Sequence, residues 1–382
     1  MKKILFFIPT LAQGGGERIV SDYSLYLPDT IERTIVLLEN KVSYPYKGKL
    51  LSLNIPTPKN FLAKAYYAVK GFFLFRRVVR QEWPSHVMSF GIMPNFLNSL
   101  LNYHAVVRIG NSLSKGSNGI RLSLLKLIVP FVYSRARGII VASYGLKEDL
   151  VKNFGISASK ISVIHNPINI KSVQKLAKES LPEEYQDIFK NPVIMNIGRL
   201  NEQKGQWHLI HAFKKIQERE GRITLLIMGE GPMKQTLKTL IVKEGLENYV
   251  HLVGWQKNPF AFLARSKIFV LPSLWEGFGS VLLEAMACKV PIISSDCDSG
   301  PRDILSPASD IHHKTTVIEY APYGILVPPG EETLLSQAIN TLFINEALQK
   351  EYKEKSLKRA MMFDVKKIFK EYQDLLETYK NF

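Results

Sequence analysis

The sequence predicts an α/β fold made of two doubly wound domains. Short apolar runs of strand length alternate with helix-length segments along most of the 382 residues, a rhythm typical of parallel sheets covered by helices. The rhythm restarts after a polar segment at residues 171–190, and a chain with 46% hydrophobic residues can fill two ordinary cores. We therefore expect one domain over residues 1–168, a second over residues 169–363, and a final helix over residues 364–382.

The apolar runs give the expected strands. They are short, are bounded by turn residues and are apolar without interruption, which favours burial on both faces of a sheet. In the first domain they are residues 3–8, 33–39, 87–90, 105–109, 138–142 and the start of 161–169. In the second they are residues 193–197, 224–228, 250–252, 268–271, 291–294 and 324–327. Helices are expected between them, including residues 17–27, and residues 331–382 are expected to be helical.

The cysteine count and the hydropathy exclude several classes of protein. Cys288 and Cys297 are too few for a disulfide framework and have no metal-ligand spacing, which favours a reducing compartment. The apolar run after Lys3 stops at Pro9, so it is interpreted as a first strand rather than a signal peptide. No run approaches the ~20 apolar residues of a membrane span.

Positive charge is concentrated in the first part of the chain. Residues 1–165 hold 22 Lys and Arg against 8 Asp and Glu, and the remainder holds 28 against 26. A net charge of +14 beside one of +2 implies an anionic partner for the first domain. Nucleic acid and an anionic membrane surface are the candidates, and we find no base-reading or stacking architecture that would favour nucleic acid.

Two segments of the first domain mix these cations with apolar residues. Residues 61–83 include Lys64, Lys70, Arg76, Arg77 and Arg80, and residues 121–137 repeat the mixture around an apolar centre at 122–133. Such helices can lie in a membrane interface, where each Lys or Arg near an anionic leaflet adds about 1 kcal/mol. Much of residues 122–133 is expected to be core. For the remainder we hypothesise peripheral docking on the inner face of the cytoplasmic membrane.

The stretch from Leu271 to Ile293 carries the clearest sign of a ligand site. It reads as the end of a strand, a glycine-containing turn with Glu276, a helix with Glu284, and another strand. Two carboxylates so placed can hold two hydroxyl-bearing parts of one ligand, and Gly277 and Gly279 let backbone amides approach it. The helix N-terminus favours a nearby phosphate. The pattern predicts a sugar-nucleotide site.

Cations are expected at the same edge of the second domain. Arg199 and Lys204 follow the strand at residues 193–197, at its carboxyl end, where open α/β sheets bind ligands. They would neutralise a departing diphosphate, and this could replace a divalent metal. Glu230 follows the next strand in a Gly-Glu-Gly-Pro turn, which is either a plain turn or part of the nucleotide pocket.

Gly14, Gly15 and Gly16 follow the first expected strand and precede a helix, where backbone amides can meet a phosphate. A nicotinamide-dependent dehydrogenase would need the spacing G-x-G-x-x-G and an acidic residue near position 39. Glu39 is in that place, but the glycine spacing fails. The glycines therefore favour a phosphate-binding loop over a dinucleotide fingerprint.

Taken in order, these motifs resemble those of retaining glycosyltransferases of family 4, which have the GT-B fold. Glu276 and Glu284 match the E-x7-E signature of that family, and the glycine, Arg199, Lys204 and Glu230 motifs match in order and spacing. The resemblance covers nearly the whole chain and is strongest at residues 193–329. It implies two Rossmann-like domains facing a cleft, with the final helix crossing back to the first domain.

The resemblance also implies roles for the site residues. Glu276 would contact the transferred sugar, Glu284 the ribose hydroxyls, and the amides of Phe278 and Gly279 the sugar and the diphosphate. Trp255, after Gly254, would lie where the family holds the base. Arg199, Lys204 and Glu276 are the expected catalytic residues.

One position departs from the family pattern. Many relatives have a histidine after the strand at residues 105–109, near the transferred sugar, whereas this chain has Arg108 and Asn111 there. Both are candidates for substrate binding. His86, His104 and His165 are interpreted as structural. The run from Asp296 to Arg302 resembles a subset of the family that builds lipid-linked or surface glycans, although a structural turn would use the same residues.

The resemblance thus implies a metal-independent, retaining glycosyltransferase without a cofactor. The expected donor is a UDP-linked hexose or N-acetylhexosamine, and the expected acceptor is a lipid-linked or surface-polysaccharide glycan. Two alternatives stay open. A sugar-nucleotide epimerase would share the pocket and would act without an acceptor, and a non-catalytic glycan-binding relative would keep only the fold.

Overall fold

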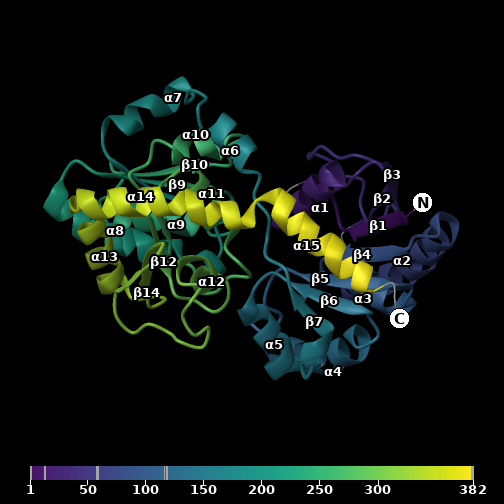
Figure 1. Cartoon of the computed structure of the whole chain (residues 1–382). Coiled ribbons are helices and arrows are strands. Elements are labelled where there is room, and N and C mark those ends of the chain that lie inside the picture. The colour runs from purple at the N-terminus through teal and green to yellow at the C-terminus, as the bar shows by residue number, and fades with distance from the viewer. Residues whose placement is uncertain (1, 13, 57–59, 116, 118, 380–382) are drawn as a thin grey trace. The chain divides into compact units, whose positions relative to one another are not determined.

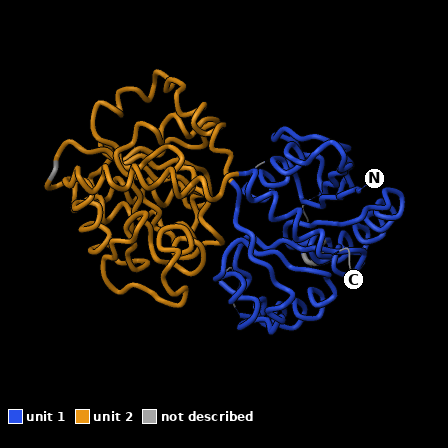
Figure 2. The backbone as a smooth tube through the Cα atoms, viewed as in Figure 1, with its two compact units in different colours: residues 1–167, 365–382 blue, residues 168–364 orange. Residues whose placement is uncertain are grey.

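The computed structural model describes the chain except residues 1, 13, 57–59, 116, 118 and 380–382. It divides into two compact units, coloured separately in Figure 2. Unit 1 comprises residues 1–167 and 365–382, and unit 2 comprises residues 168–364. These divisions fall next to the expected boundaries at 168/169 and 363/364, and the final helix belongs to unit 1.

Unit 1 is built on a parallel sheet of seven strands. The order β3-β2-β1-β4-β5-β6-β7 places β1 between β2 and β4, and every neighbouring pair is parallel. The central strands are buried along their length because helices cover both faces. The strands are β1 (Lys2–Ile8), β2 (Ile31–Leu37), β3 (Lys49–Ser52), β4 (His86–Phe90), β5 (Ala105–Ile109), β6 (Gly138–Val141) and β7 (Ile161–Val163).

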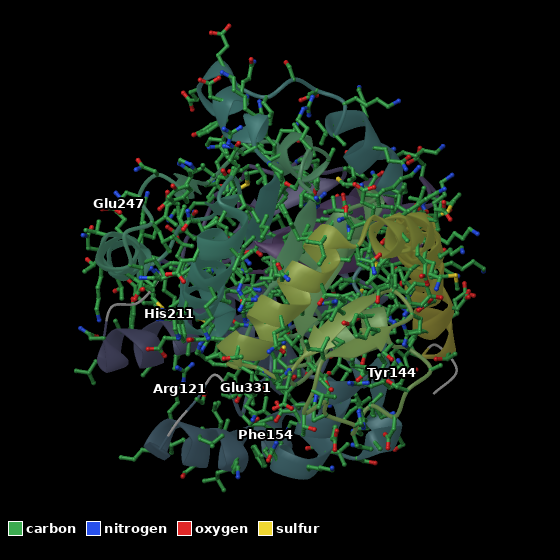
Figure 3. The ribbon with its side chains drawn as sticks, turned by 90° about the vertical axis from the view of Figure 1, so that its left-hand side faces the viewer. Arg121, Tyr144, Phe154, His211, Glu247 and Glu331 are labelled. Atoms are coloured by element: carbon green, nitrogen blue, oxygen red, sulfur yellow. The ribbon has the colours of Figure 1, made fainter. Side chains whose placement is uncertain are left out.

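Right-handed crossovers assign the helices of unit 1 to two layers. On one face lie α2 (Phe61–Glu82), α3 (Ile92–Leu101), α4 (Gly119–Tyr133) and α5 (Tyr144–Phe154), each packed on the next. On the other face lie α1 (Gly15–Tyr26) and the final helix α15 (Val365–Thr378). α4 and α5 lie side by side in Figure 1 and in Figure 3, which labels Arg121 on α4 and Phe154 on α5.

Stacked aromatic rings attach α15 to α1. The rings of Tyr23 and Phe369 stack at 4.6 Å, and Tyr23 also lies 5.4 Å from Phe6 of β1 and 5.3 Å from Tyr372. All four rings are buried in one core cluster. Such pairs contribute about 0.5–1.5 kcal/mol beyond the burial of their area, so the C-terminal helix is an integral part of unit 1.

Unit 2 repeats the architecture. Its strand order is β10-β9-β8-β11-β12-β14-β13, and all neighbouring pairs are parallel except the antiparallel pair β13–β14. The strands are β8 (Val193–Ile197), β9 (Thr224–Met228), β10 (Val250–Gly254), β11 (Ile268–Leu271), β12 (Ile292–Ser295), β13 (Glu319–Ala321) and β14 (Gly324–Val327).

The helices of unit 2 are α6 (Ile170–Leu176), α7 (Glu183–Gln186), α8 (Gln206–Glu220), α9 (Lys234–Lys243), α10 (Pro259–Leu263), α11 (Ser280–Ala287), α12 (Pro301–Leu305), α13 (Glu332–Ile344) and α14 (Glu346–Ala360). Among them, α8, α9, α13 and α14 bury one core of aliphatic and aromatic residues against this sheet. Short 3-10 turns cover Ala158–Lys160, Asp187–Lys190, Glu202–Lys204 and Met361–Phe363. Among the described helices, none has both the length and the hydrophobicity needed to cross a bilayer.

The predicted class of two doubly wound α/β domains is confirmed, with three differences. The edge strands β3 and β13 were not predicted. The expected helical C-terminal segment is broken at Asn345, which caps α14, and again before α15. The expectation that much of residues 122–133 is core was wrong, since Leu124, Leu127, Ile128 and Phe131 of α4 are exposed and only Val129, Val132 and Tyr133 are buried.

Candidate functional site

The sheet of unit 2 has a topological switch point between β8 and β11. From β8 the chain proceeds to β9 and β10 on one side, and then returns to place β11 on the other side of β8. Ligands of open α/β sheets bind outside the carboxyl ends of the strands at such a point. Lys204 follows β8 and Glu276 follows β11, so the topology brings these two predicted residues to one place.

A buried ion pair joins them. Lys204 Nζ lies 2.5 Å from Glu276 Oε1, and the side chain of Glu276 is only 5% exposed. The hydroxyl of Ser273 donates to the same oxygen at 2.6 Å. Burial raises the pKa of the neighbouring Cys297 thiol, and the Glu276 carboxylate raises it further. The carboxylate is therefore held in a fixed position by a cation and a hydroxyl.

Backbone contacts fix the two loops that carry this pair. Gln203 donates its side-chain amide to the carbonyl of Trp275 at 3.0 Å, and its own carbonyl accepts from the Leu274 amide at 2.8 Å. Gly205 has φ +58°, and a Cβ there would lie 2.4 Å from the carbonyl oxygen of Pro272. Only glycine allows this approach of one loop to the other.

Arg199 is exposed at the same edge, one residue beyond Gly198. Its loop is held against the turn after β9, because the Gly198 amide bonds to Met228 and the Leu200 amide to Glu230 at 2.9 Å. A Cβ on Gly229 would lie 1.9 Å from the Gly198 carbonyl oxygen. The glycines of the two motifs therefore serve packing between adjacent loops.

Glu230 and Trp255 follow the next two strands at this edge. Glu230 is exposed and pairs with Lys234 at 2.8 Å, which favours a structural role in the turn for its side chain. Trp255 is 61% exposed and follows Gly254, whose φ is +68°. An indole that is open to solvent beside the sheet edge offers a flat surface for stacking.

The helix α11 carries the second predicted carboxylate. Glu284 is half-buried on α11, and its charge acts with burial to raise the pKa of Cys288 to about 12. Gly279 caps the helix with φ +83°. Phe278 is 2% exposed with its ring 5.7 Å from Phe363, so only its backbone can face a ligand.

Gly14, Gly15 and Gly16 lie in unit 1, at the carboxyl end of β1 and the start of α1. Gly14 adopts φ +137°, and a Cβ there would come within 2.5 Å of Glu17. A Cβ on Gly15 or Gly16 would have no heavy atom within 4 Å. These two glycines leave an open approach to the first turn of α1.

Arg108 is tied into the core of unit 1. It is 3% exposed, its Nε donates to Tyr372 at 2.6 Å, and its Nη2 donates to Asn166. The guanidinium therefore joins β5 to α15, and these hydrogen bonds give it a structural role. Asn111, in contrast, is exposed in the loop after β5.

The histidines have structural surroundings. His86 is buried in β4, His104 bonds to Arg137 at 2.9 Å, and the ring of His165 lies 6.0 Å from that of Tyr144. Within the described part of the chain, no group of three or more His, Cys, Asp or Glu is arranged to hold a metal.

Three contributors to the site were not predicted from the sequence. Ser273 holds Glu276, and the Asp298 carbonyl accepts from the Glu276 amide at 3.2 Å. Lys314 lies beside this segment, 3.5 Å from the Asp298 carboxylate.

A hollow of about 900 Å³ lies at the opposite, amino ends of the strands of unit 2. It is lined by Lys190, Arg265 and Lys267 among others, and it contains none of the predicted site residues.

Comparison with known proteins identifies the family. The model described as glycosyl transferases group 1 matches residues 178–359, and that of glycosyltransferase family 4 matches residues 13–172. An uncharacterised glycosyltransferase of Methanocaldococcus jannaschii is 33% identical, and the match covers 94% of this chain and 92% of the relative. The N-acetylgalactosamine-N,N'-diacetylbacillosaminyl-diphospho-undecaprenol 4-alpha-N-acetylgalactosaminyltransferase of Campylobacter jejuni is 28% identical, covering 96% and 97%.

Solved structures agree on the fold. The Anabaena protein HepE in complex with UDP-glucose superposes with a TM-score of 0.75 at 19% identity, covering 99% of this chain and 100% of its own. Sucrose-phosphate synthase from Thermosynechococcus elongatus superposes with a TM-score of 0.78 at 16% identity, covering 99% of both chains. The chain therefore belongs to glycosyltransferase family 4 and is a glycosyltransferase with the GT-B fold.

Proposed function

We propose that this protein transfers a hexose or N-acetylhexosamine from a UDP-linked donor to a lipid-linked or surface-polysaccharide glycan, with retention of the anomeric configuration. The buried Lys204–Glu276 pair at the switch point of unit 2 is the observation that carries the proposal. The names of relatives support it, since one transfers N-acetylgalactosamine to a diphospho-undecaprenol glycan and another is a lipopolysaccharide galactosyltransferase. UDP-glucose in the HepE structure supports the choice of donor.

The donor would lie along the carboxyl ends of β10, β9, β8 and β11. The base would stack on Trp255, the ribose hydroxyls would bind Glu284, and the sugar hydroxyls would bind Glu276. The diphosphate would then fall between Lys204 and the exposed Arg199. Each group of the donor thus meets a residue of matching chemistry.

Sugar transfer breaks the bond between the anomeric carbon and the β-phosphate oxygen. Negative charge develops on the leaving UDP, and the fixed charges of Arg199 and Lys204 would stabilise it most in the transition state. The acceptor hydroxyl would attack the face that UDP leaves and would pass its proton to the leaving phosphate. With two cations in this role, the reaction as proposed needs no metal.

The acceptor would be reached at a membrane surface. Leu62, Tyr66, Val69 and Phe73 of α2 are exposed and share a helical face, as do Ile120, Leu124, Leu127 and Phe131 of α4. Both helices belong to the layer that continues through α3. Each of these apolar stripes, on helices of one layer, is suited to the headgroup boundary of a bilayer.

Charge supports an anionic bilayer as the occupant. Unit 1 holds 26 Lys and Arg against 11 Asp and Glu, a net +15, whereas unit 2 holds 24 against 23, a net +1. The cations Lys70, Arg77 and Arg80 of α2 and Arg121 and Lys126 of α4 are exposed beside the stripes. We propose that unit 1 docks on the inner face of the cytoplasmic membrane.

A donor screen tests the proposed function. Nucleotide sugars are added singly, with and without a membrane extract that contains acceptors, and both UDP release and glycolipid formation are measured. Release of UDP that depends on the extract supports transfer. Conversion of the donor without any acceptor would indicate an epimerase, and binding without turnover would indicate a non-catalytic relative.

A further inference from the structure

A guanidinium with all its donors satisfied lies behind the proposed donor site. Arg302 of α12 is 3% exposed. Its Nε and Nη2 donate to the Asp296 carboxylate at 3.0 and 2.6 Å, and its Nη2 and Nη1 donate to that of Glu319 at 2.7 and 3.2 Å. The fifth donor, on Nη1, reaches the Ser309 hydroxyl at 3.0 Å. Arginine has five N–H donors, so none is unused.

These acceptors come from three different segments of unit 2. Asp296 follows β12, Ser309 lies in the long loop after α12, and Glu319 begins β13. Asp296 also accepts from the Thr315 amide at 2.8 Å. Arg302 therefore links residues 296–319 into one hydrogen-bonded segment, the Arg302 cluster, at the carboxyl edge of the sheet.

The Arg302 cluster supports the loop of Glu276 through backbone contacts. Trp275 forms a bridge with Asp298, and the Glu276 amide donates to the Asp298 carbonyl at 3.2 Å. Gly300 adopts φ +88°, and a Cβ there would lie 2.2 Å from the carbonyl oxygen of Phe278. The segment 298–300 is thus packed backbone to backbone against residues 275–278.

The chemistry of the cluster requires arginine. The side chain of Asp296 is fully buried, and two carboxylates face one cation, so loss of the guanidinium would leave an uncompensated buried charge. Burial acts to lower the pKa of Arg302, but the hydrogen bonds and charges of Asp296 and Glu319 raise it overall. A lysine keeps the charge but has no planar fork of donors.

We propose that Arg302 is a positioning residue that sets the place of the Glu276 carboxylate. It acts through Asp296, the Asp298 carbonyl and the Glu276 amide, and it does not touch the donor. The inference rests on the proposed function and adds a distinction: Arg302 governs recognition of the transferred sugar, whereas Trp255 and Glu284, which would hold the nucleotide, receive none of its hydrogen bonds.

The test compares Arg302→Lys with the wild type in binding of UDP and of the UDP-sugar found by the donor screen. The expected result is an unchanged Kd for UDP, a loss of the extra affinity given by the sugar, and a fall in kcat of about 100-fold, the scale of a 1 Å misplacement. Glu319→Gln, at a partly exposed partner, is expected to shift the same quantities less and serves if the first variant does not fold.

Leu342→Ala is the matched control, because this residue is buried in the core of the same unit on α13. It should lower the free energy of unfolding without separating UDP affinity from UDP-sugar affinity. Hydrogen exchange of the amides at 274–279 should accelerate in the Arg302 and Glu319 variants and not in the control.

The outcomes are distinct. A wild type that binds no nucleotide sugar overturns the proposed function. If the wild type binds and transfers, and Arg302→Lys and Glu319→Gln match it in both affinities and in kcat, the positioning role is overturned. Equal losses of UDP and UDP-sugar affinity in those variants also overturn it.

Discussion

Arg108 and Tyr372 are hydrogen-bonded across 264 positions of sequence, with 2.6 Å between the arginine Nε and the phenol oxygen. Both are buried, and burial raises the pKa of the Tyr372 hydroxyl, which keeps it neutral as an acceptor. This contact fixes the C-terminal helix to the sheet of unit 1. Arg108, a candidate for substrate binding from the sequence, thus contributes to the architecture of unit 1.

Tyr372→Phe is expected to destabilise unit 1, because it leaves a buried N–H donor without this acceptor. The loss should be about 1–3 kcal/mol. Denaturant unfolding measures it, with the exposed Tyr320→Phe as a control that should change little. Equal free energies of unfolding for the two variants would contradict the structural role.

Glu276→Ala is expected to lower kcat by at least about 100-fold, since it removes a fixed carboxylate from the sugar end of the site. Glu351→Ala is the control, because Glu351 is half-exposed on α14 and pairs with Lys355 four residues away. Sugar transfer to the membrane extract is the measurement. Similar turnover in both variants would show that Glu276 has no catalytic role.

Trp255→Ala should weaken UDP binding by about tenfold or more, since stacking of a base on an aromatic ring contributes about 1–3 kcal/mol. Titration calorimetry with UDP gives the Kd. Trp83→Phe, at an exposed tryptophan of unit 1, should bind UDP as the wild type does. Unaltered UDP affinity in Trp255→Ala would show that the base binds elsewhere along the carboxyl edge of the sheet.

Docking predicts that the protein sediments with vesicles containing anionic lipid and less with neutral ones, and that added salt weakens binding. The double variant Phe73→Ser with Leu127→Ser should lose this binding. Val242→Ser with Ile344→Ser removes comparably exposed apolar residues from unit 2 and should retain it. A wild type with no preference for anionic lipid would refute the docking surface.

Glu82 should make the stability of unit 1 depend on acidic pH. Its side chain is 8% exposed; burial acts to raise its pKa, but hydrogen bonds from Lys49 and Lys3 lower it overall. A lowered folded-state pKa stabilises the native state above the ordinary value of 4.5, and the contribution is lost as pH falls through the folded value. The difference in unfolding free energy between wild type and Glu82→Gln should therefore shrink below about pH 4.5. A difference that stays constant between pH 7 and pH 3 would show that the carboxylate is not responsible.

The positions of most strands along the chain were predictable because apolar runs with sharp polar ends leave few choices. β5, β8, β9, β11 and β14 coincide with the expected ranges. β3 and β13 were missed because each is a short edge strand with partly exposed residues, which gives no continuous apolar run. Burial in α4 was misjudged because composition does not show which apolar residues of a helix find a partner.

The predicted site residues of unit 2 lie along one sheet edge, since each follows a parallel strand. What the sequence could not show is pairing between loops. Arg302 of α12 and Glu319 of β13 are 17 positions apart across an irregular loop, and Arg108 meets Tyr372 only through the return of the chain. No periodic pattern encodes such contacts, because they depend on the assembled backbone.

The return of α15 makes unit 2 an uninterrupted insertion into a domain whose two pieces come from opposite ends of the chain. Its own ends are adjacent, since Ile168 and Asp364 form a bridge and the Ile168 amide bonds to the Phe363 carbonyl at 2.9 Å. We therefore expect residues 168–364 to fold as a single excised fragment. A stop codon placed before Val365 would instead deprive unit 1 of the helix that completes its aromatic core.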